Sequence, residues 1–191
     1  MKQLWSPWRI NYIRGDRPPD CVFCSAPREQ ASPENLVLFR GQHSYVMMNR
    51  YPYTNGHLMI IPYAHIAMLT DVPADTQIEM LQEINMSIEI LREVMNPQGY
   101  NVGLNLGASA GAGIRDHIHF HVVPRWVGDT NFMAVVGETN VIVEGLIECF
   151  SQLKPAFDCR CGPDDPSGFR PKRGSPDDAT ADRSGDQGSG V

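Results

Sequence analysis

The amino-acid sequence predicts an α+β fold with a roughly five-stranded antiparallel sheet, one long helix and a shorter C-terminal helix. Short segments rich in β-branched and large apolar residues are separated by short turns. One long segment carries apolar residues at helical spacing, and the strand pattern then returns before a second helical segment. Strands joined by short turns pair antiparallel, and an amphipathic helix buries its apolar stripe against such a sheet.

The first half of the chain contains three predicted strands, at 36–40, 45–49 and 57–62. Each is short and rich in Val, Ile, Leu, Met or Tyr, a composition typical of strands. The segment 51–56 reads Tyr-Pro-Tyr-Thr-Asn-Gly, which predicts a turn between the second and third strands.

After Pro73 the pattern becomes helical. Apolar residues recur at spacings of three and four, at Ile78, Leu81, Ile84, Ile88, Leu91 and Met95. This spacing predicts an amphipathic helix that ends near residues 97–99 and packs its apolar stripe into the core. Segments 100–105 and 117–124 return to the strand pattern, and 141–153 predicts the second helix.

One folded domain is predicted over residues 1–157, followed by a tail over residues 158–191. The tail is rich in Asp, Gly, Pro, Ser and Arg, and its sizeable apolar residues are Phe169 and Val191. Such a composition buries too little apolar surface to offset the entropy lost on ordering, so we expect the tail to be disordered.

Composition and charge narrow the class of protein. Hydrophobic residues make up 42% of the 191 residues, and the net charge of −6 argues against a nucleic-acid partner. No apolar run approaches the ~20 residues of a membrane span, and the N-terminus lacks the apolar core of a secretion signal. We therefore expect a cytoplasmic protein with no membrane partner, whose five cysteines are reduced thiols.

Three histidines at alternating positions, His117, His119 and His121, form the most informative motif. Alternate residues of a strand share one face, so three imidazoles would line one side and apolar residues the other. One ring can attack phosphorus while its neighbours donate hydrogen bonds to the oxygens. Successive Cα atoms on that face lie about 7 Å apart, so these rings alone cannot close around one metal. The alternative is a polar run on a solvent-facing strand.

A glycine-rich segment, residues 107–113, immediately precedes the histidines. Glycines let backbone N–H groups turn inward and approach a phosphate as an anion-binding nest. The segment joins two predicted strands, so it differs from dinucleotide-binding and P-loop turns, which lead into helices. The alternative is a flexible hairpin loop, but the position directly upstream of the histidines favours phosphate binding.

Cys21 and Cys24 have the spacing of half a tetrahedral zinc site. No second cysteine pair follows within the predicted domain, so histidines would have to complete the site. The candidate histidines are His65 and His117 and, less favoured, His43 and His57. A site closed by four protein ligands is structural rather than water-activating. The alternatives are a redox-active dithiol or two unrelated buried thiols.

Asn49 is predicted to end the second strand, where a side-chain amide can reach a ribose hydroxyl. An asparagine that only terminates the strand is an equally good interpretation. His57, taken alone, is typical of a buried, hydrogen-bonded histidine.

Together these motifs resemble the histidine-triad (HIT) family of nucleotide hydrolases and transferases. The resemblance rests on the run His-Ile-His-Phe-His-Val-Val-Pro at 117–124 and on Asn49 with Asn-Gly-His at 55–57. The longer stretches 99–107 and 117–132 are similar to the branch that includes bacterial diadenosine tetraphosphate phosphorylases.

The opening Leu-Trp-Ser-Pro-Trp-Arg at 4–9 also fits that branch, and the resemblance covers about residues 1–155. It implies a dinucleoside polyphosphate phosphorylase or hydrolase that acts at the nucleotide α-phosphate through a covalent AMP-histidine intermediate. It further implies an adenine dinucleoside polyphosphate as substrate, and a homodimer in which two sheets join edge to edge.

The resemblance also implies roles for single residues. His119 would be the nucleophile and His121 would contact the phosphate. His57 would support the triad from behind, and Asn49 would bind ribose. The residues implied to hold phosphate oxygens are Asn105, Ser109, Gly111 and Gly113. The implied ligands of a structural zinc are Cys21, Cys24, His65 and His117. No organic cofactor is implied.

Three alternatives stay open at this point. A nucleoside phosphoramidase or nucleotidyl transferase would use the same chemistry on a different leaving group. A non-catalytic nucleotide sensor would bind in the same groove without turnover. A zinc-stabilised interaction domain would use its histidines for the metal alone.

Overall fold

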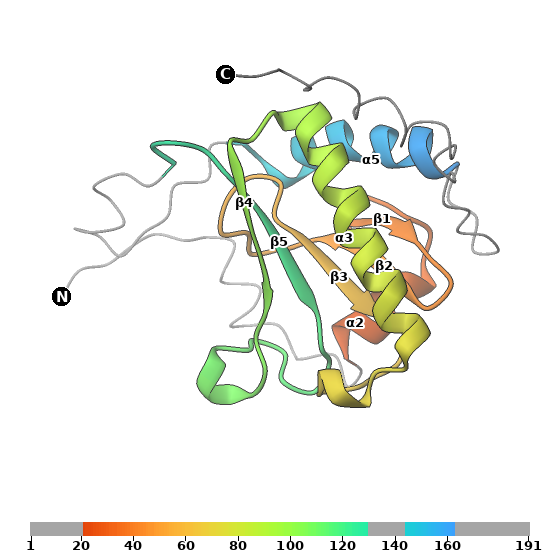
Figure 1. Ribbon diagram of the computed structural model, residues 1–191. Helices are drawn as coiled ribbons and strands as arrows, with labels where there is room; N and C mark the ends of the chain where they lie inside the picture. The colour runs from red at the N-terminus through yellow and green to blue at the C-terminus, as the bar shows by residue number, and fades with distance from the viewer. Residues whose placement is uncertain (1–20, 130–143, 163–191) are drawn as a thin grey trace, which may run out of the picture.

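The computed structural model describes residues 21–129 and 144–162, which form a five-stranded antiparallel sheet with helices packed on it (Figure 1). The strands are β1 (Val37–Arg40), β2 (Ser44–Met48), β3 (Leu58–Pro62), β4 (Gly99–Leu104) and β5 (Phe120–Arg125). The helices are α2 (Val22–Ser25), α3 (Ala74–Met95) and α5 (Leu146–Cys161), with single 3-10 turns η1 (Ala26–Arg28), η2 (Leu69–Asp71) and η3 (Ala108–Ala110). The strand order is β1-β2-β3-β5-β4, which confirms the predicted α+β fold and makes β4 an edge strand.

The predicted strand bounds agree closely with the structure except at β5. This strand begins at Phe120 rather than at residue 117. Its neighbour β3 ends at Pro62, which has no N–H to donate, and the Pro62 carbonyl accepts a hydrogen bond from the His117 side chain instead. The ladder between the two strands therefore ends at Phe120, so that of the three histidines only His121 lies on β5 and His117 and His119 precede it.

Helix α5 continues to Cys161, past its predicted end at residue 153 and past the predicted domain boundary at residue 157. Phe157 is buried, so this last part of the helix contributes to the core. The predicted start of this helix at residue 141 and the tail from residue 163 onward lie outside the described residues. None of the helices in the two described ranges has the length and apolarity needed to cross a lipid bilayer.

The pairing register places the histidines and the helical core on opposite faces of the sheet. His121 of β5 pairs with Met59 of β3 and with Gly103 of β4, so these three residues share one face. Leu58 and Val122 pair on the other face, where both are fully buried. Helix α3 lies across this second face, and α5 packs against α3 and β1 (Figure 1).

The predicted apolar stripe of α3 is only partly correct. Ile84 and Leu91 are buried, but Ile78 and Leu81 are 54% and 55% exposed. The buried face carries four polar residues, Thr76, Glu79, Glu83 and Ser87. The helix is rotated relative to the prediction because two of these polar side chains have partners on β2, which a periodic pattern does not reveal.

A buried cluster of Ser44, Glu79 and Glu83 joins the start of β2 to α3. Oε1 of Glu79 accepts hydrogen bonds from the backbone N–H groups of His43 and Ser44, at 2.8 and 3.0 Å. The Ser44 hydroxyl lies 2.8 Å from Oε2 of Glu83 and 3.2 Å from Oε1 of Glu79, yet it has one hydrogen to donate. Burial raises the pKa of Glu83 well above its usual range. Burial thus favours the protonated form of Glu83, in which this carboxyl can donate to Ser44 while Ser44 donates to Glu79.

Candidate active site

The first histidine of the triad, His117, faces the cysteine pair. Its side chain is fully buried, and its Nε2–H donates a hydrogen bond to the backbone carbonyl of Pro62 at 2.8 Å. A carbonyl only accepts, so the proton of the neutral ring is on Nε2. Nδ1 then directs its lone pair toward the Sγ atoms of Cys21 and Cys24, each 3.5 Å away.

Four ligand atoms come within 4.8 Å of one another at this point, from Cys21, Cys24, His65 and His117. Sγ of Cys24 lies 3.4 Å from Nδ1 of His65. In a tetrahedral site with zinc bonds of about 2.3 Å to sulfur and 2.0–2.1 Å to nitrogen, such atoms would lie about 3.5 Å apart. The two sulfur and two nitrogen atoms, and the distances between them, therefore fit a bound zinc ion. The less favoured candidates, His43 and His57, are not in the cluster.

The second histidine, His119, is oriented by the first. Its Nδ1–H donates a hydrogen bond to the backbone carbonyl of His117 at 3.0 Å, so Nε2 keeps an unshared electron pair. The ring is buried against Phe23, which lies between the two cysteines in the sequence, with 4.8 Å between ring centroids. Burial lowers the pKa of His119, which favours the neutral ring. A neutral ring with an unprotonated nitrogen can act as a nucleophile.

A series of two hydrogen bonds, from Tyr53 to His57 and from His57 to His121, orients the third histidine, His121. The backbone N–H of Tyr53 donates to Nδ1 of His57 at 3.1 Å, so the proton of the neutral His57 ring is on Nε2. Nε2–H of His57 donates to Nδ1 of His121 at 2.9 Å, which places the His121 proton on Nε2 in turn. Within the described part of the chain, this buried Nε2 has no hydrogen-bond partner. It is a donor available to a bound oxyanion.

Both rings of this series are held neutral. Burial, with smaller contributions from His121 and His119, lowers the pKa of His57 to about 3. Burial, with a smaller contribution from His119, lowers the pKa of His121 to about 4. Because each neutral ring has one N–H and one lone pair, the direction of every hydrogen bond in the series is fixed at neutral pH.

Two of the predicted nucleotide-binding residues lie beside the histidines. Nδ2 of Asn49 is 3.4 Å from Nδ1 of His57, and Oδ1 of Asn49 accepts the backbone N–H of Tyr51 at 2.9 Å. Asn105 lines the same cavity as His121. Both asparagines therefore lie near histidines of the site.

The glycine-rich loop is exposed except at Ala112, which is buried, and Gly111 follows η3 with a left-handed φ of 84°. A side chain with a Cβ adopts this conformation with difficulty, which accounts for the glycine. Among the hydrogen bonds of the described residues, none joins Ser109, Gly111 or Gly113 to the histidines. Their predicted contacts with phosphate remain a prediction.

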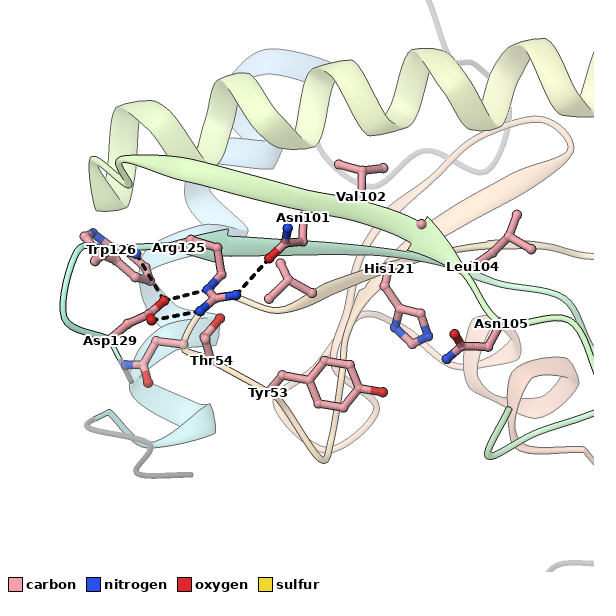
Figure 2. Close-up of a pocket in the computed structure, with 13 residues that line it drawn as sticks. Tyr53, Thr54, Asn101, Val102, Leu104, Asn105, His121, Arg125, Trp126 and Asp129 are labelled. Atoms are coloured by element: carbon pink, nitrogen blue, oxygen red, sulfur yellow. Dashed lines mark hydrogen bonds and ion pairs between the residues drawn. The ribbon is translucent and has the colours of Figure 1, made fainter. Parts of the chain in front are cut away.

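A cavity of about 530 Å³ opens beside His121 (Figure 2). Its walls come from residues 53–55, from β4 with Asn105, and from β5 with the turn that follows it. Arg125 lies at the far end, where Asp129 and Asn101 accept its hydrogen bonds. No sequence motif pointed to these three residues as part of the site. A signal was present, because Arg125 continues the alternate positions of His119 and His121 in the sequence.

This fold, with an unprotonated Nε2 on His119 and an N–H presented by His121, defines a histidine-triad protein. The sequence profile of the HIT domain matches residues 30–127, and the chain belongs to the HIT family.

A relative named AP-4-A phosphorylase, from Mycobacterium tuberculosis, is 38% identical over 151 residues, which cover 74% of this chain and 77% of the relative. An adenosine 5′-monophosphoramidase from Saccharomyces cerevisiae is 31% identical over 105 residues, 55% of this chain and 62% of that one. Among solved structures, a zinc-bound histidine triad family protein from Mycobacterium smegmatis matches with a TM-score of 0.59 and 26% identity, covering 73% of this chain and 94% of its own. The predicted family and fold are confirmed.

Proposed function

We propose that this protein is a dinucleoside polyphosphate phosphorylase or hydrolase, which cleaves diadenosine tetraphosphate at an α-phosphate through a covalent AMP intermediate on His119. The observation that carries the proposal is the hydrogen bond from Nδ1–H of His119 to the His117 carbonyl, which leaves Nε2 unprotonated. The relative named AP-4-A phosphorylase supports this substrate class.

In the first step, Nε2 of His119 attacks the α-phosphorus. A P–N bond forms, the bond from that phosphorus to the bridging oxygen breaks, and the oxygen leaves with its electron pair as part of ATP. Nδ1–H stays on the ring and still donates to the His117 carbonyl, which stabilises the positive charge that the ring acquires. Nε2–H of His121 donates to an oxygen on which negative charge develops.

In the second step, an oxygen of inorganic phosphate or of water attacks the same phosphorus. The P–N bond breaks, and its electron pair returns to Nε2 of His119. Phosphate as acceptor gives ADP, and water gives AMP and releases a proton. The supporting roles proposed for the remaining residues are ribose binding by Asn49 and phosphate contacts by Asn105, Ser109, Gly111 and Gly113.

We further propose that Cys21, Cys24, His65 and His117 hold a structural zinc ion. The spacing of the donor atoms supports this, as does the zinc-bound neighbour from Mycobacterium smegmatis. When bound, the ion would link Cys21 and helix α2 to the start of the triad. Helix α2 contributes Phe23, whose ring contacts His119, and its position is fixed further by the Tyr45 hydroxyl, which donates to the Phe23 carbonyl at 2.7 Å.

The second candidate is a nucleoside phosphoramidase, which the relative from Saccharomyces cerevisiae favours. It would use the same attack by His119 but release a small amine instead of a nucleotide. The two candidates differ in the leaving group, so turnover of matched substrates distinguishes them.

The test is to incubate the protein with diadenosine tetraphosphate, with and without inorganic phosphate. ADP and ATP that form only with phosphate identify a phosphorylase, and AMP and ATP that form without phosphate identify a hydrolase. A His119→Ala variant serves as the control and should be inactive. Tight nucleotide binding without any product would favour the non-catalytic sensor and contradict the proposal.

By family analogy we also propose a cytoplasmic homodimer. β4 is an edge strand, and its residues Asn101, Val102 and Gly103 are exposed, so its edge is available for pairing with a second copy. Light scattering at micromolar concentration should give the mass of a dimer, and a monomer would contradict the pairing.

A further inference from the structure

The cavity extends along the sheet well beyond the triad. His121, Val123 and Arg125 alternate along β5 and line it together, with Asn101 of β4 opposite Val123 (Figure 2). At about 3.3 Å per residue, Arg125 lies roughly 13 Å from His121 along the strand. The attack on phosphorus requires only the end near His121, where Asn105 and the His121 N–H offer donors to phosphate oxygens. The rest of the cavity is free for another part of the substrate.

The far end of the cavity has no excess of positive charge. Arg125 donates its Nε and Nη2 hydrogens to Asp129 at 2.6 and 2.9 Å, in a paired arrangement that neutralises the guanidinium. Asn55, which also lines the cavity, donates to a second carboxylate, that of Glu144, at 3.4 Å. One cation beside two carboxylates is a poor site for another phosphate, so an uncharged polar group fits better.

Arg125 nevertheless offers hydrogen bonds from a fixed position. Of the five N–H donors of a guanidinium, two go to Asp129 and one to Asn101 at 2.8 Å, which leaves two. Its side chain is 41% exposed. Because the ion pair already holds the guanidinium, little conformational entropy is lost when a ligand accepts these hydrogen bonds. Ribose hydroxyls and base nitrogens or oxygens are suitable acceptors.

We propose that the far end of this cavity binds the nucleoside of the departing nucleotide, with Arg125 and Asn101 as specificity-determining residues. The proposal rests on the proposed function, in which the AMP half is bound at His119. A polyphosphate chain bridges the distance from the triad to Arg125, whereas the small leaving group of a phosphoramidate does not. The cavity volume lies within the range of small-molecule sites and accommodates a nucleoside with its phosphates.

The test compares two substrates that share the AMP half, diadenosine tetraphosphate and adenosine 5′-phosphoramidate. The variants are Arg125→Gln and Asn101→Ala, the latter at an exposed position where folding is not at risk. Arg160→Gln is the matched control, because Arg160 pairs with Glu89 and Glu93 on the surface of α3. The ratio of kcat/KM for the dinucleotide to kcat/KM for the phosphoramidate should fall roughly tenfold in Arg125→Gln, as expected for one or two lost hydrogen bonds. It should stay constant in Arg160→Gln.

A ratio that stays constant in both cavity variants would overturn the subsite. Binding separates this result from a failure of the proposed function. If the unmodified protein turns over neither substrate, dissociation constants for AMP and for a non-hydrolysable diadenosine tetraphosphate analogue still test the cavity. Arg125→Gln should weaken the analogue roughly tenfold relative to AMP. Equal effects on both ligands would contradict the proposal.

Discussion

Nδ1 of His119 and the backbone carbonyl of His117 are joined by a hydrogen bond of 3.0 Å, while the imidazole of His117 faces Cys21 and Cys24. One residue therefore connects the cysteine cluster with the nucleophile. Its side chain belongs to the candidate metal site, and its main chain sets the tautomer of the reacting ring.

The first prediction concerns the metal. Purified protein should contain about one zinc ion per chain, since four protein ligands close the site, and Cys24→Ser should lose it. Chelation should lower the melting temperature, because the binding free energy of a structural zinc stabilises the fold. Cys149→Ser is the control, since Cys149 is buried in α5 outside the cluster, and it should retain zinc. Protein from zinc-replete medium without bound metal would contradict the site.

The second prediction concerns the series from Tyr53 to His121. His57→Phe removes the N–H that donates to Nδ1 of His121, so the His121 proton is no longer held on Nε2. We expect kcat to fall tenfold or more, because side chains that position protons in a transition state contribute effects of at least this size. Nitrogen-15 NMR should show a single His121 tautomer in the unmodified protein and a mixture in the variant. The same tautomer in both proteins would rule out this role for His57.

The third prediction concerns pH and stability. The pKa of His57 is about 3 and that of His121 about 4 in the folded chain, against about 6.5 in an unfolded one. Between these values the unfolded state binds more protons, so the free energy of unfolding should fall as the pH drops from about 6.5 toward 4. Urea denaturation at pH 7 and pH 5 measures this. His57→Gln should show a shallower dependence, and an equal slope would contradict the burial of neutral His57.

The fourth prediction concerns Glu83. Its raised pKa means that the folded chain binds this proton more tightly than the unfolded chain does, so at neutral pH, where the unfolded carboxyl is ionised, the buried group costs stability. Glu83→Gln should therefore be neutral or stabilising at pH 7, and any gain should shrink at pH 4, where the unfolded carboxyl is protonated too. Glu79→Ala should instead cost about 2 kcal/mol or more, because it leaves the buried N–H groups of His43 and Ser44 without an acceptor. Equal losses for the two variants would contradict the proton assignment.

Much of the fold was predictable because it depends on local patterns. Alternation placed Val122 in the core and His121 on the opposite face, and the three-four spacing located the long helix. The phase of that helix was not predictable, because Glu79 and Glu83 are buried by partners on β2. The far end of the cavity was missed because it too depends on contacts between residues far apart in the sequence. Arg125 contacts Asn101 only because β4 pairs with β5, and this pairing cannot be read from the sequence.

Chemical trapping of the intermediate is the most direct test of attack by His119. The protein is mixed with diadenosine tetraphosphate, quenched in alkali during turnover, and analysed by peptide mass spectrometry. We predict one adenylyl group on the peptide that contains His119, stable in alkali and lost in acid, and none in His119→Ala. Rapid turnover without this adduct, or undiminished activity of His119→Ala, would contradict attack by His119.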